Sequence, residues 1–192
     1  LDLICFHTSK KEVHFENILY EKNSKNEFVH NGMTLKNKCK TLPYEKIVAL
    51  YDLFKDDWVR IADDKKEYWQ LMSLQQLKEI SENDLFTIGS HGNTHANLEA
   101  INFEDAKKEI ILSKQKLEAA CNKKIEEFAF PFGKYNNLLV DFCKSLGFKR
   151  ILLVDYNNVN DHYETTTRNR FVINPYIPFN HQIACLLKGS YF

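Results

Sequence analysis

The chain has 192 residues, enough for one domain with a hydrophobic core and too few for two large ones, so we expect a single domain over residues 1–192. Lys and Arg number 26, as do Asp and Glu, so no net charge favours nucleic acid or an anionic membrane as the partner. No apolar run approaches the length of a membrane span. The five cysteines include no C-x-x-C pair, and they are typical of free thiols in a reducing compartment.

The first third of the chain carries few regular patterns. LDLICF, residues 1–6, is a short apolar run bounded by polar residues, which is typical of a buried strand. Residues 10–42 are polar and irregular, and we interpret them as an insertion with a turn at residues 30–32. Pro43 opens a helical pattern over residues 44–54, and a second helix begins at Ser73 with a capping-box spacing.

Helices and strands alternate in the rest of the chain. The patterns predict strands at 85–90, 128–132 and 150–155, and helices at 102–121, 136–148 and 181–189. This order predicts an α/β fold with a mainly parallel sheet or barrel, whose ligands bind at the carboxyl ends of the strands. His91 and the turn Pro131–Gly133 both directly follow such ends.

His91 and His95 lie four residues apart in a polar loop. The chain has seven histidines, so this spacing alone favours neither a metal site nor an ordinary turn. Two neutral imidazoles at a strand end can converge on one Zn²⁺ and leave positions open for water and substrate. The pair is one ligand short of the usual three.

The strings around the pair are more specific than the pair itself. IGSHGNTHANL, followed by a long amphipathic helix and FAFPFGKYN, resembles the polysaccharide deacetylase family, also called the NodB homology family or carbohydrate esterase family 4. His91 and His95 match the ligands of that family's H-[ST]-x-x-H motif, and Pro131, Phe132 and Gly133 match its R-x-P-[YF]-G motif. The resemblance covers roughly residues 72–178, where several spaced motifs agree.

The resemblance implies a distorted (β/α) barrel and a hydrolase that acts on carbon–nitrogen bonds other than peptide bonds. In the family a divalent metal activates water against acetyl groups, chiefly N-acetyl, of a polysaccharide or oligosaccharide. Zinc is the first choice here, with Co, Ni or Mn as alternatives. His91 and His95 would be the metal ligands, and the Phe132 N–H would hold the oxyanion. Pro131, Gly133 and Tyr135 would contact the substrate.

The sequence departs from the family at its acidic motif. The family's TFDDG string, which supplies the general base and the third metal ligand, does not occur. The adjacent acids Asp56 and Asp57, and Asp63 and Asp64, are interpreted as solvated surface groups. LDLICFHTS resembles the family's second strand, so we expect the barrel to lack its first strand and helix, with the Asp pair outside this chain.

Further departures affect the groups around the pair. Gly92 replaces Ser or Thr, Ala129 replaces one arginine, and Tyr176 replaces another. His162 and His181 are available as the general acid, although each position favours a surface histidine. The absent acids and arginines motivate a second hypothesis, in which a catalytically degenerate deacetylase fold binds a glycan or a partner without turnover.

Several aromatic residues outside the motifs are candidates for stacking on sugar rings. For any one of them, packing in the core or its rim is favoured over stacking, except for Tyr135 beside the third motif. The candidates are Trp58, Tyr68, Trp69, Tyr135 and Tyr176.

Overall fold

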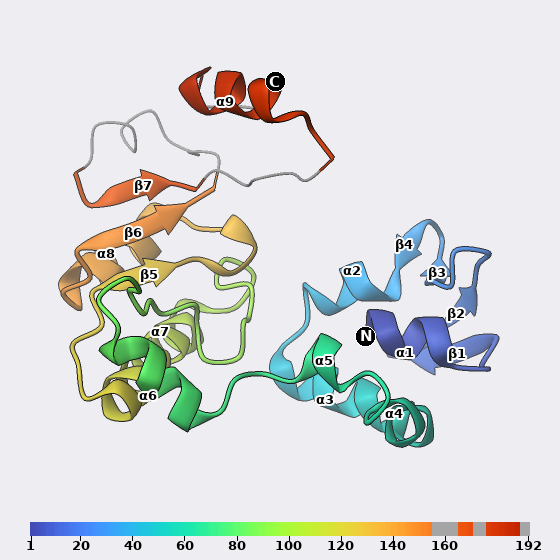
Figure 1. Cartoon of the computed structure of the whole chain (residues 1–192). Coiled ribbons are helices and arrows are strands. Elements are labelled where there is room, and N and C mark those ends of the chain that lie inside the picture. The colour runs from blue at the N-terminus through green and yellow to red at the C-terminus, as the bar shows by residue number, and fades with distance from the viewer. Residues whose placement is uncertain (155–164, 171–175, 189–192) are drawn as a thin grey trace. The chain divides into compact units, whose positions relative to one another are not determined.

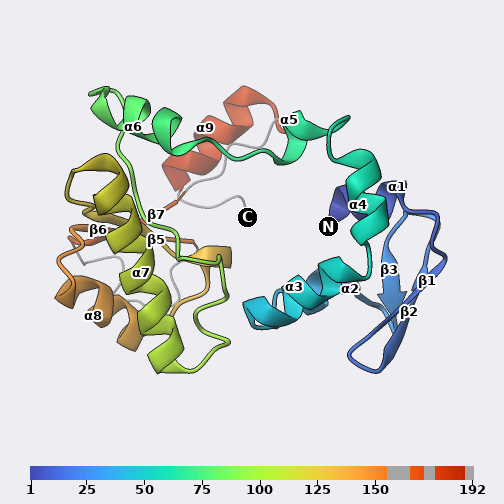
Figure 2. The same cartoon turned by 90° about the horizontal axis from the view of Figure 1, so that it is seen from below.

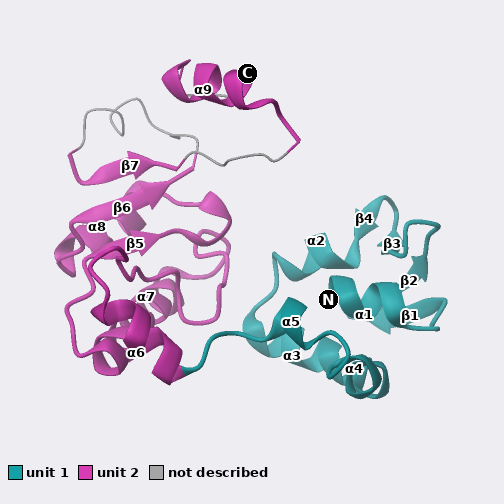
Figure 3. Cartoon of the chain, viewed as in Figure 1, with its two compact units in different colours: residues 1–73 teal, residues 74–192 magenta. Residues whose placement is uncertain are grey.

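The computed structural model describes residues 1–154, 165–170 and 176–188, coloured along the chain in Figure 1. The chain divides into two compact units, residues 1–73 and 74–192, which Figure 3 distinguishes by colour. Each unit has its own hydrophobic core and is described by itself. The expected single domain over residues 1–192 stays a prediction.

The first unit contains a four-stranded antiparallel meander in the order β1-β2-β3-β4. Its predicted turn at residues 30–32 is confirmed, because Asn31 and Gly32 take positive φ values of 46° and 79° between β3 and β4. Such a two-residue turn matches the twist of paired strands. The strands are Glu12–Phe15 (β1), Ile18–Lys22 (β2), Phe28–His30 (β3) and Met33–Thr34 (β4).

The polar segment expected to be irregular is therefore an ordered element with a core of its own. Tyr20, Phe28 and Leu35 are each only 1% exposed, and they pack with Leu50 and Phe54 from the helical part of the unit. The meander alternates these few apolar residues with many charged ones. Low overall hydrophobicity concealed the alternation when the sequence was considered alone.

The predicted strand at residues 1–6 is wrong, because Asp2–His7 forms helix α1. Leu1, Ile4 and Cys5 face the core while Phe6 is 63% exposed. This spacing of i, i+3 and i+4 is that of one helix face, and a six-residue stretch with five apolar residues fits a strand equally well by hydrophobicity alone.

Four further helices complete the first unit. The helix predicted after Pro43 is confirmed as α3. Trp69 on α5 donates its indole N–H to the carbonyl of Ala62, 2.7 Å away, at the end of α4. The bounds are Leu35–Cys39 (α2), Tyr44–Asp52 (α3), Lys55–Ile61 (α4) and Lys66–Trp69 (α5).

The second unit contains a three-stranded sheet in the order β5-β6-β7, whose parallel pairing the alternating pattern predicted, although β7 was not among the predicted strands. Its strands are Glu127–Ala129 (β5), Arg150–Leu153 (β6) and Thr167–Asn169 (β7). The strand expected at residues 85–90 is reduced to one parallel bridge, between Ser90 and Phe128. The described strands form an open sheet, so the parallel α/β arrangement is confirmed and the closed barrel is not. The missing first strand and helix stay a prediction.

Helices connect the strands of the second unit. α7 lies alongside both α6 and α8, as Figure 2 shows. Asn102 caps α7 by accepting the N–H of Asp105 at 2.9 Å, and Asn122 ends it in the left-handed conformation. The predicted helices are confirmed as Leu74–Glu82 (α6), Phe103–Cys121 (α7), Asn137–Ser145 (α8) and Phe179–Lys188 (α9).

The core of the second unit lies between the sheet and its helices. Phe128 and Ile151 from the strands are fully buried, as are Ala106 and Ile110 from α7. Within the described residues, no helix combines the length and the apolar character needed to cross a membrane.

Candidate functional site

The candidate site lies at the carboxyl end of the parallel sheet of the second unit. Ser90 pairs with β5 through its N–H to Glu127 and its carbonyl to the N–H of Ala129, both at 2.8 Å. His91 follows at once, so the histidine loop leaves the sheet beside the end of β5. The single bridge therefore brings the loop next to the turn Pro131–Gly133 (η1), which begins two residues after β5.

The imidazole of His91 is oriented by a backbone carbonyl. Its Nδ1–H donates to the carbonyl of Ala129, 2.6 Å away. A donor bond at Nδ1 sets the tautomer in which Nε2 carries the free lone pair. Ala129 stands at the arginine position of the family motif, and its carbonyl provides this bond whatever the side chain. The departure at Ala129 therefore leaves the orientation of His91 intact.

The His95 ring lies edge-to-face against that of His91, with ring centroids 4.8 Å apart, and against Phe132 at 4.7 Å. Burial, and next the neighbouring His91, lower the pKa of His95. A lowered pKa favours the neutral imidazole, which is the form that binds metals. The structure thus brings His91, His95 and Phe132 together, as the sequence predicted.

The loop between the histidines is held from α7. The Glu109 carboxylate accepts the N–H of Thr94 at 2.7 Å and its hydroxyl at 3.0 Å. Gly92 has a φ of +80°, and an added Cβ would lie 3.4 Å from Pro131 and 3.6 Å from the Glu109 carboxylate. Gly92 is therefore suited to its left-handed position, where the family usually has Ser or Thr. Sequence reasoning missed Glu109, which no motif distinguishes from the other charged residues of α7.

The turn Pro131–Gly133 has two consecutive left-handed residues, Phe132 with a φ of 56° and Gly133 with 67°. A Cβ on Gly133 would lie 2.6 Å from Cβ of Val154, closer than real Cβ contacts permit. Among the described residues, the Phe132 N–H has no backbone hydrogen-bond partner. Backbone strain of this kind, held by tight packing, is common where a main-chain group serves a function.

The other residues expected to contact the substrate are buried within this turn or just after it. Pro131 and Gly133 are buried, and Tyr135 is 1% exposed and stacks on Phe130 with ring centroids 5.6 Å apart. The ring of Tyr135 packs in the core of the second unit. The buried Tyr135 ring therefore supports the turn and offers no open face to a sugar.

Two buried hydroxyls support the start of the histidine loop. Ser90 and Ser113 lie 2.5 Å apart through their Oγ atoms, and the Ser113 hydroxyl also lies 3.0 Å from the carbonyl of Ile110, which accepts from it. Both side chains are almost fully buried, so each depends on these bonds. The pair connects α7 to the residue that precedes His91.

Arg170 is a further residue that sequence reasoning missed. It follows β7 directly and donates from its guanidinium to the carbonyl of Phe130 at 3.0 Å. Its Nε is buried without a hydrogen-bond partner in the described part of the chain, and burial lowers the pKa of the guanidinium. The signal that could have identified Arg170 is its position directly after a parallel strand, because the carboxyl edge of the sheet also carries His91 and Pro131.

The candidate acids belong to the first unit, and the candidate general acids belong to the C-terminal part of the chain. Asp57 is not solvated as predicted, since its side chain is 12% exposed and accepts the Thr8 hydroxyl at 2.7 Å. It lies in the first turn of α4, in the first unit. His181 is exposed on α9, and His162 lies outside the described residues. The described residues contain no group of three or more His, Cys, Asp or Glu placed to hold a metal.

Solved structures with a similar fold include deacetylases. A Streptococcus pyogenes deacetylase in complex with acetate aligns with a TM-score of 0.51 at 22% identity, over 60% of this chain and 50% of that one. A Bacillus cereus polysaccharide deacetylase aligns at 0.48 and 24% identity, over 59% and 35% of the two chains. This chain thus spans about half the length of the streptococcal enzyme. The first likeness supports the fold alone.

Comparison with curated proteins gives no match. The profile of the polysaccharide deacetylase family matches residues 18–151, a segment that includes both histidines and the turn Pro131–Gly133. The profile covers more than half of the chain and both of the motifs that build the candidate site. The chain belongs to the polysaccharide deacetylase family.

Proposed function

We propose that this chain takes part in the hydrolysis of acetyl groups, chiefly N-acetyl, from a polysaccharide, with a divalent metal held by His91 and His95. The observation that carries the proposal is the bond from Nδ1 of His91 to the carbonyl of Ala129 at 2.6 Å. Metal-binding histidines commonly donate their second ring nitrogen to a carbonyl or carboxylate in this way. The family membership supplies the class of substrate and reaction.

The two imidazoles fit a divalent ion of the zinc type. His91 has a defined tautomer with Nε2 available, and the lowered pKa of His95 keeps its ring neutral near neutral pH. Neutral imidazole suits Zn²⁺, Co²⁺ and Ni²⁺ better than it suits Mg²⁺ or Ca²⁺. When bound, such a metal supplies a Lewis acid and lowers the pKa of water.

The backbone of Phe132 provides the oxyanion contact. Its N–H is uncommitted to other described backbone groups, and its ring lies against that of His95. Attack on an acetyl carbonyl places negative charge on the carbonyl oxygen, and a preorganised N–H stabilises that charge without rearrangement. The packing of Gly133 on Val154 holds the turn in place during this step.

Arg170 supplies a guanidinium to the second unit, whereas Ala129 and Tyr176 stand where the family motifs have arginine. Its buried Nε and its bond to the carbonyl of Phe130 place a positive charge at the carboxyl edge of the sheet. A charge there orients an acidic group that completes the site. The third metal ligand and the general base come from outside the described cluster of His91, His95 and Phe132.

The test measures metal and turnover separately. Purified protein is loaded with Zn²⁺ or Co²⁺, and its metal content is compared with that of His91→Ala, His95→Ala and the control His14→Ala, whose side chain is exposed on β1. We expect about one metal ion per chain in the parent and control and loss in both site variants. Equal metal content in all four proteins would show that the ligand assignment is wrong.

Turnover is then assayed as acetate release from acetylated chito-oligosaccharides. Metal-dependent release that both site variants abolish supports the enzyme. Stoichiometric metal binding without release supports the second hypothesis, a degenerate deacetylase that binds glycan without turnover. The two readouts therefore separate the ligand assignment from the activity.

A further inference from the structure

The first unit contains a cavity of about 600 Å³ that is lined by four aromatic, three aliphatic and three charged residues. It is formed by the first turn of α1, the end of α3 and the helices α4 and α5. Three of the five aromatic residues singled out by the sequence line it, namely Trp58, Tyr68 and Trp69, and Tyr51 joins them. Its volume is that of a site for a small ligand.

The two indoles are held in position by the protein itself. Trp58 and Trp69 pack edge-to-face with ring centroids 5.0 Å apart and an interplanar angle of 69°. The bond from the Trp69 indole to the carbonyl of Ala62 satisfies its polar N–H and restricts its rotation. A ligand would therefore meet rings that are already ordered, which lowers the entropic cost of binding.

The aromatic surface is open to solvent. Tyr68 is 69% exposed, Tyr51 43% and Trp69 38%. Trp58 is partly buried against the core of the unit, and packing leaves the other three rings partly uncovered. Their exposure distinguishes this cavity from the core of the unit, where Phe28 and Phe54 are fully covered.

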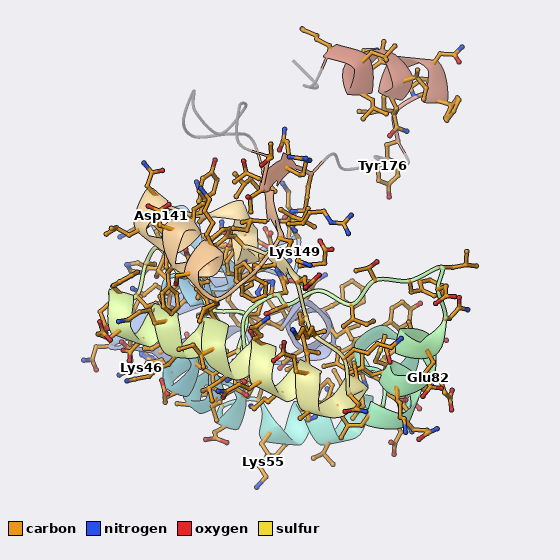
Figure 4. All side chains as sticks on the ribbon, turned by 90° about the vertical axis from the view of Figure 1, so that its left-hand side faces the viewer. Lys46, Lys55, Glu82, Asp141, Lys149 and Tyr176 are labelled. Atoms are coloured by element: carbon orange, nitrogen blue, oxygen red, sulfur yellow. The ribbon has the colours of Figure 1, made fainter. Side chains whose placement is uncertain are left out.

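Charged groups stand beside the rings. Asp52 and Lys55 line the same cavity, and Figure 4 shows Lys55 extending outward from its ribbon. Over the residues that the structure describes, neither side chain forms an ion pair or a side-chain hydrogen bond. A carboxylate and an ammonium group can accept from and donate to hydroxyls.

We propose that this cavity binds a pyranose ring of a polysaccharide. The apolar faces of a sugar stack on aromatic rings, while its hydroxyls pair with groups such as Asp52 and Lys55. A purely apolar occupant would leave both charged groups without a partner, whereas the hydroxyls of a sugar can donate to Asp52 and accept from Lys55. The proposal rests on the proposed function for the class of ligand, and its residues are separate from His91, His95 and Phe132.

Tryptophan fluorescence can be used to measure ligand binding in this cavity. It has two tryptophans, and both line the cavity. The 192-residue protein is titrated with N-acetylated chitohexaose up to about 10 mM, and tryptophan emission is followed. We expect a saturable change in intensity that is independent of protein concentration. No saturable change, or one that follows protein concentration and so reports a second copy, would overturn the proposal.

Tyr68→Ala and Tyr44→Ala make a matched pair of variants. Both tyrosines are exposed in the first unit, only Tyr68 lines the cavity, and both variants keep the two reporters. We expect Tyr68→Ala to weaken binding about 5-fold, from lost ring contact, and Tyr44→Ala to leave it unchanged. Equal effects of the two variants would show that the sugar binds elsewhere.

His91→Ala separates this inference from the proposed function. The variant is expected to lose metal and acetate release and to bind chitohexaose in the fluorescence titration as tightly as the parent. A flat titration of a protein that still releases acetate overturns the cavity assignment alone. A normal titration of a protein that neither binds metal nor releases acetate overturns the proposed function alone.

Discussion

Replacing Gly133 with Ala tests how tightly the third-motif turn is packed. The new Cβ would lie 2.6 Å from Cβ and 2.9 Å from Cγ2 of Val154, and its residue would have a φ of +67°. A left-handed φ costs an L-residue about 1–2 kcal/mol, and forced overpacking adds about 1–3 kcal/mol. The free energy of unfolding should therefore fall by about 2–5 kcal/mol.

Gly147→Ala is the matched control for backbone strain alone. Gly147 has a φ of +82°, and an added Cβ there meets no atom within 4 Å. Its substitution should cost only about 1–2 kcal/mol. The difference between the two variants in urea-induced unfolding then measures the clash with Val154. Should both variants lose the same stability, Val154 yields without cost and the argument for a tightly held turn fails.

Three further predictions concern groups around the site and along α7. Ser113→Ala leaves the buried Ser90 hydroxyl without its partner and should cost about 1–3 kcal/mol in urea unfolding, whereas the double variant Ser90→Ala/Ser113→Ala should cost less than the two single changes summed. Glu109→Ala frees Thr94 and should weaken Zn²⁺ binding about 10-fold in a chelator competition, while Lys116→Ala, which removes an exposed bond to Asn93, should not. The Ile125 N–H, and then Lys114, hold the pKa of Glu118 below its usual 4.5, so the carboxylate stabilises the fold above pH 4.5 and this contribution is lost as the pH falls through the lowered pKa. Glu118→Gln should flatten that acid limb of stability, and an unchanged limb would refute the assignment.

The second unit was largely predictable because its elements are long or bounded by strong signals. α7 shows a helical period over 19 residues with an Asn cap, and β5 and β6 lie between turn residues. The motif strings also named His91, His95 and Phe132, whose rings lie against one another in the structure, while their roles stay predictions. Local pattern and tertiary contacts agree in this part of the chain.

The first unit was less predictable for physical reasons that particular residues illustrate. Residues 1–6 are too short for hydrophobicity to separate a helix from a strand, and burial of Ile4 with exposure of Phe6 decides the matter. In the meander, positive φ values at Glu16 and Asn17 form a turn that composition does not indicate. Asp57 is largely covered and accepts a hydrogen bond from Thr8, 49 residues away, a contact that the local sequence does not indicate.

The site contacts that the sequence missed share one property. Glu109, Ser113 and Arg170 act through partners far along the chain and belong to no local string. Their side chains are ordinary residues of a helix or a strand end until the fold brings the histidine loop beside them. Such contacts follow from the three-dimensional arrangement and not from spacing.

The helical phase of α7 links two contacts made from opposite flanks of the helix. Its core face carries Ile110 and Ser113, while Glu109 on one flank holds the histidine loop and Glu118 on the other holds the N–H of Ile125 at 3.0 Å. Each residue advances the helix by about 100° and about 1.5 Å. One residue inserted between Glu109 and Glu118 would rotate one anchor by about 100° against the other, with every side chain retained. The number of residues between Glu109 and Glu118 therefore sets the angle between the contact that holds the His91 loop and the contact that holds the residues before β5.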